Sequence, residues 1–228
     1  MAESKVDKNT NSIEKEFTEK LKIDEVRPKI ENSQKPIKEN SQIRENENKQ
    51  HDLNDSWVLW YSAGIKKTRN VSENDWMRSL EDVCSFKTVE EFWEIFDNLR
   101  PISMMEPSAS FYLFKDGIKP TWEDDANKIG GRWMLSFRGS ERDACDEIWL
   151  FLTMGMVGNV LDHDNDICGA VISSREDELR LSVWTKTGSD MRTQLMIGNN
   201  LKRVLMLPSD KNLMYRLHDG GKIEYKIV

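Results

Sequence analysis

The sequence predicts an α+β domain in which three helices pack on one face of a mainly antiparallel sheet. Short runs rich in β-branched and aromatic residues recur from Ser56 to the C-terminus, and three helical patterns interrupt them. The two kinds of segment do not alternate as βαβ units would. The region 51–228 is long enough to bury a full hydrophobic core.

Seven runs are typical of strands, because each combines β-branched or aromatic residues with turn residues nearby. Long polar loops at Ile65–Asn74 and Leu99–Ser110 separate the elements of the first half. The predicted strands are Ser56–Ser62, Phe111–Lys115, Arg132–Phe137, Ile167–Ser173, Leu179–Lys186, Leu213–His218 and Lys222–Ile227.

Three segments have helical patterns, and each begins with a residue that favours a helix start. In Thr88–Leu99, Glu91 follows the N-cap Thr88 by three residues, which predicts a capping box. The other two helices are predicted at Asp143–Val157 and Asp190–Leu205, each with an acid at its start.

The first two predicted helices carry more apolar surface than docking on a sheet requires. Apolar residues of the first span an arc of roughly 160°, against the ~100° stripe of a docked helix. Val89 and Trp93, at the edge of that arc, should therefore be partly exposed. In the second helix, apolar residues between Ile148 and Val157 point in nearly every direction. Either both helices are unusually apolar core elements, or they form a protein-binding patch.

Residues 1–50 have a different composition from the rest of the chain. They contain no Trp, Gly or Cys, a single aromatic residue (Phe17), and 11 basic against 11 acidic residues. Such a segment cannot bury enough apolar surface to offset the entropy lost on ordering. We therefore predict a disordered charged tail over residues 1–50 and a folded domain over residues 51–228, which carries the whole net charge of −7.

Composition and charge exclude several classes of protein. No stretch approaches the ~20 apolar residues of a membrane span, so we expect no membrane partner. An acidic domain is a poor general binder of nucleic acid, because that affinity comes mainly from phosphate neutralisation. If the domain binds RNA, it should bind one particular part of the RNA molecule. The cysteines Cys84, Cys145 and Cys168 have no paired spacing, which favours a reducing compartment, cytoplasmic or also nuclear.

The sequence shows no catalytic motif, and we expect no enzyme activity, metal or cofactor. There is no Walker loop and no nucleophile elbow. The histidines His51, His163 and His218 are too scattered for a zinc site. His163 lies in the acidic run Asp162–Asp166, which is more typical of a solvated loop than of a catalytic one. An enzyme that acts on nucleotides by metal-assisted hydrolysis would need a carboxylate–metal cluster, and none is visible.

Two of the eight tryptophans, Trp76 and Trp122, lie in polar loops, and Glu123 follows the second. An indole beside a carboxylate suits a flat, electron-poor ligand: the ring stacks on its face, and the carboxylate accepts hydrogen bonds from its edge. The alternative is that each indole merely covers the core. Arg175 and Arg180 flank an acidic turn and form either a hairpin ion-pair set or, if they face the same cavity as the indoles, a phosphate clamp.

Longer motifs across residues 51–228 resemble the eukaryotic translation initiation factor 4E family, the messenger-RNA cap-binding proteins. All eight tryptophans fall where that family has them. Trp60–Ser62, Trp122–Lys128 and Leu201–Pro208 resemble its divergent 4E-homologous class. The motifs that carry the family resemblance are Ser56–Tyr61, Thr88–Trp93, Tyr112–Asp124, Gly130–Trp133, Ile167–Val171 and Val183–Trp184.

The resemblance implies a curved, mainly antiparallel eight-stranded sheet with three helices on its convex face. In the concave mouth, Trp76 and Trp122 would hold 7-methylguanine between their rings, and the positive charge of the methylated base would add cation–π attraction. Glu123 would accept hydrogen bonds from the base edge, and Trp184 would line the methyl group.

The resemblance also assigns the cap phosphates to Arg175 and Arg180, with Arg132 nearby through water. The family usually has a second basic residue two positions after the first, where this chain has Asp177. An acid there should weaken binding of the triphosphate and flatten its salt dependence.

A partner surface follows from the same resemblance. His51, Val89, Trp93, Leu150 and Met154 would bind the helix of a 4G-type scaffold, or of a 4E-binding regulator, with a Tyr-x-x-x-x-Leu-φ motif. The expected function is cap recognition that feeds translation initiation. The alternative is a cap-occupying repressor of the 4E-homologous class, which does not recruit the scaffold. The alternative of another class is a cap or nucleotide hydrolase.

Overall fold

The computed structural model describes residues 50–64, 79–162, 164–220 and 223–227. The predicted tail lies outside these ranges except for Gln50, and so does the predicted polar loop Ile65–Asn74.

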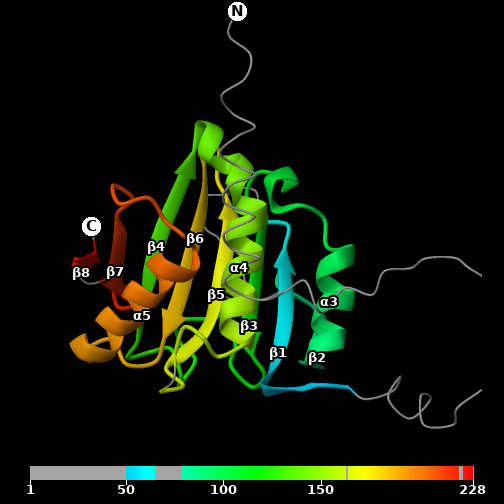
Figure 1. Cartoon of the computed structure of the whole chain (residues 1–228), viewed down its shortest axis with the longest axis horizontal. Helices are drawn as coiled ribbons and strands as arrows, with labels where there is room; N and C mark the ends of the chain where they lie inside the picture. The colour runs from blue at the N-terminus through cyan, green and yellow to red at the C-terminus, as the bar shows by residue number, and fades with distance from the viewer. Residues whose placement is uncertain (1–49, 65–78, 163, 221–222, 228) are drawn as a thin grey trace, which may run out of the picture. The chain divides into compact units, whose positions relative to one another are not determined.

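The described strands form one eight-stranded antiparallel sheet in the order β2-β1-β3-β5-β6-β4-β7-β8, which confirms the predicted fold class (Figure 1). The strands are β1 (Asp52–Ser62), β2 (Glu81–Thr88), β3 (Ser110–Lys115), β4 (Gly131–Arg138), β5 (Ile167–Ser174), β6 (Glu178–Thr185), β7 (Leu213–Leu217) and β8 (Ile223–Ile227).

Strand β2 was not among the seven runs predicted from the residue pattern. It lies at the edge of the sheet and pairs only with β1, so most of its side chains meet solvent. Val83, for example, is 52% exposed. An edge strand does not need the apolar alternation that reveals a half-buried strand. Strand β1 also begins earlier than predicted, because Asp52 pairs with Thr88 of β2.

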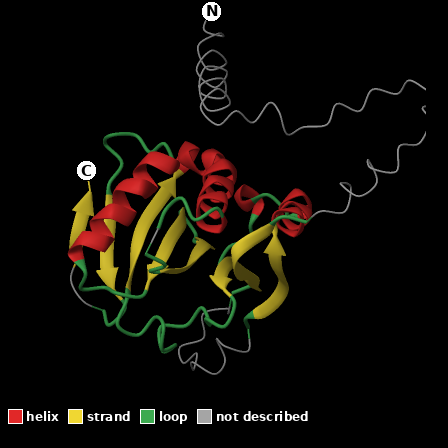
Figure 2. Cartoon of the chain, turned by 60° about the horizontal axis from the view of Figure 1, so that its bottom comes forward, coloured by secondary structure: helices red, strands yellow, loops and turns green. Residues whose placement is uncertain are grey.

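The three predicted helices are present and cover the convex face of the sheet (Figures 1 and 2). They are α3 (Val89–Asn98), α4 (Cys145–Val157) and α5 (Met191–Val204). The predicted capping box is confirmed: the Thr88 hydroxyl accepts from the Glu91 N–H at 3.2 Å, and the Glu91 carboxylate accepts from the Thr88 N–H at 3.2 Å. The prediction that the second helix starts at Asp143 was wrong, because the short 3₁₀ helix η3 (Gly139–Ala144) precedes α4.

The hydrophobic core lies between the helices and the sheet. Alternate residues of β4, Trp133, Leu135 and Phe137, are buried against this layer. From the helices, Trp149 of α4 and Ile197 of α5 join the same cluster. Because side chains of a strand alternate between its two faces, the intervening residues of β4 point to the concave face.

Candidate functional site

The concave face over β6, β4 and β7 carries polar and aromatic side chains in register. Trp184 pairs with Arg132, which in turn pairs with Arg216 on β7. Four residues along β4, Ser136 pairs with Arg180 of β6. The pairing therefore places an indole and three guanidinium groups on one surface.

A cavity of about 320 Å³ opens on this face. It brings together five of the residues predicted for ligand binding, and it joins the loop after β3 to strands β4, β5 and β6. Its lining consists of Tyr112, Pro120, Trp122, Arg132, Met134, Val171, Ser173, Arg175, Arg180, Ser182 and Trp184.

One further predicted ligand residue, Glu123, does not line this cavity. Glu123 lies beside Trp122 on the same loop and is exposed. Trp76 lies outside the described residues.

Trp122 projects into solvent from a loop that is held in place. Its side chain is 56% exposed, which does not fit an indole that covers the core. The buried Asn127 amide donates to the carbonyls of Lys119 at 2.9 Å and Thr121 at 2.7 Å. The Asp124 carboxylate accepts from the backbone N–H groups of Lys119 at 3.1 Å and Ala126 at 2.9 Å. The loop thus presents the ring without needing its burial.

Trp184 lies on the floor of the cavity, in contact with other rings. It meets Phe114 edge-on at 5.4 Å between ring centres and His218 at 4.2 Å. Gly169, which pairs with Trp184 across β5 and β6, makes room for this arrangement. A Cβ atom at that position would lie 2.4 Å from the Phe114 ring.

Arg132 is partly buried near other cations. Burial, and then the charges of Arg216 and Arg180, lower its pKa from the ordinary value. Burial beside Arg132 lowers the pKa of His218 to about 4. His218 is therefore neutral at pH 7, and its Nδ1 accepts a hydrogen bond from Arg132 at 3.4 Å.

Arg180, the candidate for a phosphate clamp, forms an ion pair with Glu178. The buried carboxylate of Glu178 accepts from Arg180 Nε at 3.1 Å and from Arg138 Nε at 3.0 Å. Burial opposes ionisation of Glu178, but these hydrogen bonds outweigh it and keep its pKa below the ordinary value. Arg175, by contrast, is exposed at the edge of the cavity. Arg180 thus makes a hairpin ion pair and also faces the cavity that Trp122 lines, and its role as a phosphate clamp stays a prediction.

Part of the predicted partner surface lies at the start of α3. The His51 ring contacts the Glu90 carboxylate at 2.6 Å, and the Val89 N–H donates to the His51 carbonyl at 2.8 Å. Hydrogen bonds from the His51 ring and from the His51 backbone N–H, the latter at 2.9 Å, lower the pKa of Glu90 to about 2. Val89 and Trp93 are each 37% exposed, as their place at the edge of the apolar arc predicts.

Residues of α4 complete that surface only partly. Leu150 and Met154 are half-buried and pack on the core. The apolar excess of α4 is used mostly inside the protein, since Trp149, Leu152 and Met156 are buried. The core interpretation therefore holds for most of α4.

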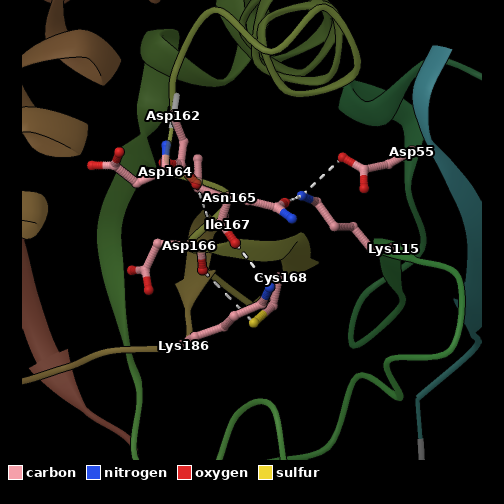
Figure 3. A network of polar contacts seen from close by, with 9 residues as sticks. All are labelled: Asp55, Lys115, Asp162, Asp164, Asn165, Asp166, Ile167, Cys168 and Lys186. Carbon is pink, nitrogen blue, oxygen red and sulfur yellow. Dashed lines mark hydrogen bonds and ion pairs between the residues drawn. The ribbon is translucent and has the colours of Figure 1, made fainter.

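The acidic run after α4 proved structural rather than solvated at two of its positions (Figure 3). Asp162 is 4% exposed and accepts from the Ile167 N–H at 2.6 Å. Asp166 is 5% exposed and accepts from the Thr187 hydroxyl at 2.7 Å. The interpretation of this run as a solvated loop was wrong for these residues, because they satisfy backbone and hydroxyl donors. His163 lies outside the described residues.

The cavity contains residues that the sequence interpretation did not single out, among them Tyr112, Ser173 and Ser182. Strand alternation would have found Ser182, which lies two residues from both Arg180 and Trp184 on β6. Tyr112 and Ser173 reach this face through the pairing of neighbouring strands, which the sequence alone does not show.

Among the described residues, no group of three His, Cys, Asp or Glu side chains is arranged to hold a metal ion. Within the same ranges, no helix is long and apolar enough to cross a membrane.

Comparisons with known proteins agree with this fold. The chain is 38% identical over 169 residues to eukaryotic translation initiation factor 4E of Dictyostelium discoideum, a match that covers 74% of this chain and 65% of that protein. The chain thus spans slightly less than two thirds of the length of that curated relative.

Two solved structures are also similar. C. elegans eIF4E-3, in complex with the 4E-binding protein Mextli and a cap analog, has a TM-score of 0.70 and 35% identity, covering 78% of this chain and 100% of that one. Ascaris suum eIF4E-3 with an m2,2,7G cap has a TM-score of 0.69 and 34% identity, covering 79% and 98%. The sequence model described as eukaryotic initiation factor 4E matches residues 52–225. The chain belongs to the eukaryotic initiation factor 4E family.

Proposed function

We propose that this protein binds the 7-methylguanosine cap of messenger RNA in the concave cavity and binds a 4E-binding helix on its helical face, and that it thereby controls translation initiation. The observation that carries the proposal is the exposed Trp122 ring, held by a fixed loop at the mouth of a cavity that also contains three arginines. Solved relatives that hold a cap analog and an m2,2,7G cap support the same ligand class.

The base would stack on Trp122, with Trp76 as the second ring. Methylation at N7 gives the purine a positive charge, and an indole face attracts a cation by about 0.5–2 kcal/mol. Glu123, exposed beside Trp122, would accept from the N1–H and N2–H groups of the base. Trp184 would line the methyl group from the cavity floor.

The cap phosphates would lie along Arg175, Arg180 and Arg132. Since Glu178 already offsets part of the Arg180 charge, the phosphate contact of Arg180 should be weaker than that of an unpaired arginine. Asp177 lines the neighbouring cavity with Arg175 and Arg180 and would repel a phosphate that extends that way.

The partner helix would dock on Trp93 and Val89, with His51, Leu150 and Met154 beside them. Exposed apolar side chains at helical spacing suit an amphipathic helix from a 4G-type scaffold or a regulator. The complex of the C. elegans relative with a 4E-binding protein supports a partner of this kind.

The role is one of binding without catalysis, at the site of cytoplasmic translation, because the matched relatives are named as initiation factors. Residues 51–228 form the cap-binding domain and residues 1–50 its charged tail, in keeping with a family match that begins at residue 52.

A tryptophan fluorescence titration tests the cap proposal. We expect 7-methyl-GTP to quench the emission and to bind at least tenfold more tightly than GTP, because only the methylated base is cationic. Equal affinity for the two nucleotides would contradict the proposal.

A further inference from the structure

A second cavity, of about 390 Å³, lies on the concave face next to the first. The two share Met134 and Arg180, so a ligand that leaves the first cavity past Arg180 reaches the second. Strands β4, β6 and β7 and the segment before β7 form it. Its lining consists of Met134, Ser136, Arg180, Asp210, Lys211, Asn212, Met214 and Arg216.

Two arginines are directly opposed between the two cavities. Arg132 of β4, in the first, pairs in register with Arg216 of β7, in the second. Like charges directly opposite on neighbouring strands destabilise a sheet. Their proximity is sufficient for the Arg216 charge to depress the pKa of Arg132, after the effect of burial. An anion between them would relieve this repulsion.

The cations of the second cavity differ in how far they are already neutralised. Lys211 pairs with Glu141 at 2.7 Å and lies 4.8 Å from the centre of the Phe137 ring. Arg180 pairs with Glu178. The exposed Arg216 side chain makes no ion pair and no hydrogen bond with the residues whose side chains the structure describes. Among those residues, Arg216 is therefore the cation of this cavity that has no neutralising partner.

The other way out of the first cavity is less favourable to phosphates. It runs along the β5–β6 turn, where a third cavity of about 420 Å³ contains Arg138, Arg175 and Arg180. These are matched there by Glu176, Asp177 and Glu178. A chain of phosphates would gain little on that side, whereas the cavity over β7 has Arg216 without a described ion-pair partner and Asp210 as its only acidic lining residue.

We propose that capped RNA leaves the first cavity over β4 and β7, and that Arg216 binds a backbone phosphate downstream of the cap. This inference rests on the proposed cap-binding function. It assigns to β7 a phosphate contact that the sequence interpretation placed only on Arg175, Arg180 and Arg132. The ligand class is the phosphodiester backbone of RNA, held in place by the cap.

The proposal separates two ligands by length. 7-Methyl-GMP, with one phosphate, fills the first cavity only, whereas a capped five-nucleotide RNA extends to Arg216. Arg216→Gln should therefore leave the affinity for 7-methyl-GMP unchanged and weaken that for the capped RNA about threefold to tenfold. Loss of one phosphate contact should also lower the slope of log K against log salt by about 0.7, the value for single strands.

Two matched variants control for charge and for route. Arg203→Gln removes one positive charge from the exposed end of α5, on the opposite face, and should change neither affinity. Arg138→Gln removes one from the end of β4, in the cavity beside the β5–β6 turn, and should affect the capped RNA less than Arg216→Gln does. Thermal unfolding should show that Arg216→Gln is no less stable than the unmodified protein, because a repulsion is removed.

The outcomes are distinct. Equal loss for both ligands with Arg216→Gln, no loss for either, or a larger loss with Arg138→Gln overturns the route over β7. If the unmodified protein binds capped RNA no better than the uncapped RNA of the same sequence, and does not bind 7-methyl-GMP, the cap-binding proposal fails and this inference fails with it.

Discussion

The two faces of the sheet come from the same strands but use their aromatic residues differently. On the helical face Trp133 is 1% exposed and contacts Tyr215, so its indole contributes to the core. On the concave side Trp122 is 56% exposed and is held by its loop rather than by packing. This difference shows that the number of tryptophans alone does not indicate whether they pack in the core or bind a ligand. What separates the two roles is whether the backbone near the ring is stabilised without the ring.

The largest expected effect is a loss of stability when the buried tryptophan, Trp133, is removed. Trp133→Ala should lower the free energy of unfolding by about 3–5 kcal/mol, because it leaves a large cavity in the core. Trp122→Ala, the matched change on the exposed side, should alter that free energy by no more than about 0.5 kcal/mol. Urea denaturation followed by circular dichroism measures both. Similar losses in the two variants would show that Trp122 contributes to the core and that the two-role division is wrong.

A smaller effect is expected on peptide binding at the outer surface of the helices. Trp93→Ala should weaken binding of a Tyr-x-x-x-x-Leu-φ peptide by about 2 kcal/mol or more, as expected for an aromatic residue central to an interface. The affinity for 7-methyl-GTP should remain unchanged, because Trp93 belongs to α3, which covers the face of the sheet opposite the cavity. Calorimetry with each ligand makes the measurement, and Met191→Ala on α5 is a matched exposed apolar control. Joint loss of peptide and cap binding would place Trp93 in the core.

The smallest expected effect tests the edge of the cap site. Glu123→Ala should lower the affinity for 7-methyl-GTP several-fold, since two donors of the base lose a charged acceptor. Asp125→Ala, two residues further along the same loop, is the control: its exposed carboxylate pairs with Lys128 rather than with the cavity. Fluorescence quenching measures both affinities. Unchanged binding in Glu123→Ala would remove this residue from the site.

The sequence predicted the helices and the central strands well, for a local reason. The capping box at Thr88 and the N-cap at Asp190 depend only on neighbouring residues, and both are present in the structure. The apolar alternation of β4 and the aromatic run of β1 reflect burial on one face, which any packed sheet requires. Edge strand β2 could not be predicted in this way, since its pairing with β1 does not require an apolar pattern.

The site could be predicted in part. The resemblance assigned Trp122, Trp184, Arg132, Arg175 and Arg180 to one site, and all five line the cavity. It did not reveal that the carboxylates of Glu178, Asp162 and Asp166 are buried. Burial depends on elements that pack from elsewhere in the chain, as when Arg138 donates to Glu178 and Gln194 donates to Asp166. The roles assigned to Trp76 and Glu123 stay predictions.

By itself, the sequence determined the α+β class, the starts of α3 and α5 and the family, because propensity, capping and motifs are local properties of the chain. Only the tertiary structure decided which charges meet. Arg132 and Arg216 are far apart in the sequence, and no local pattern connects them, yet antiparallel pairing of β4 with β7 sets them directly opposite each other. Electrostatic energy depends on distance in space and on burial, so the route of a phosphate chain across this face is a property of the folded sheet alone.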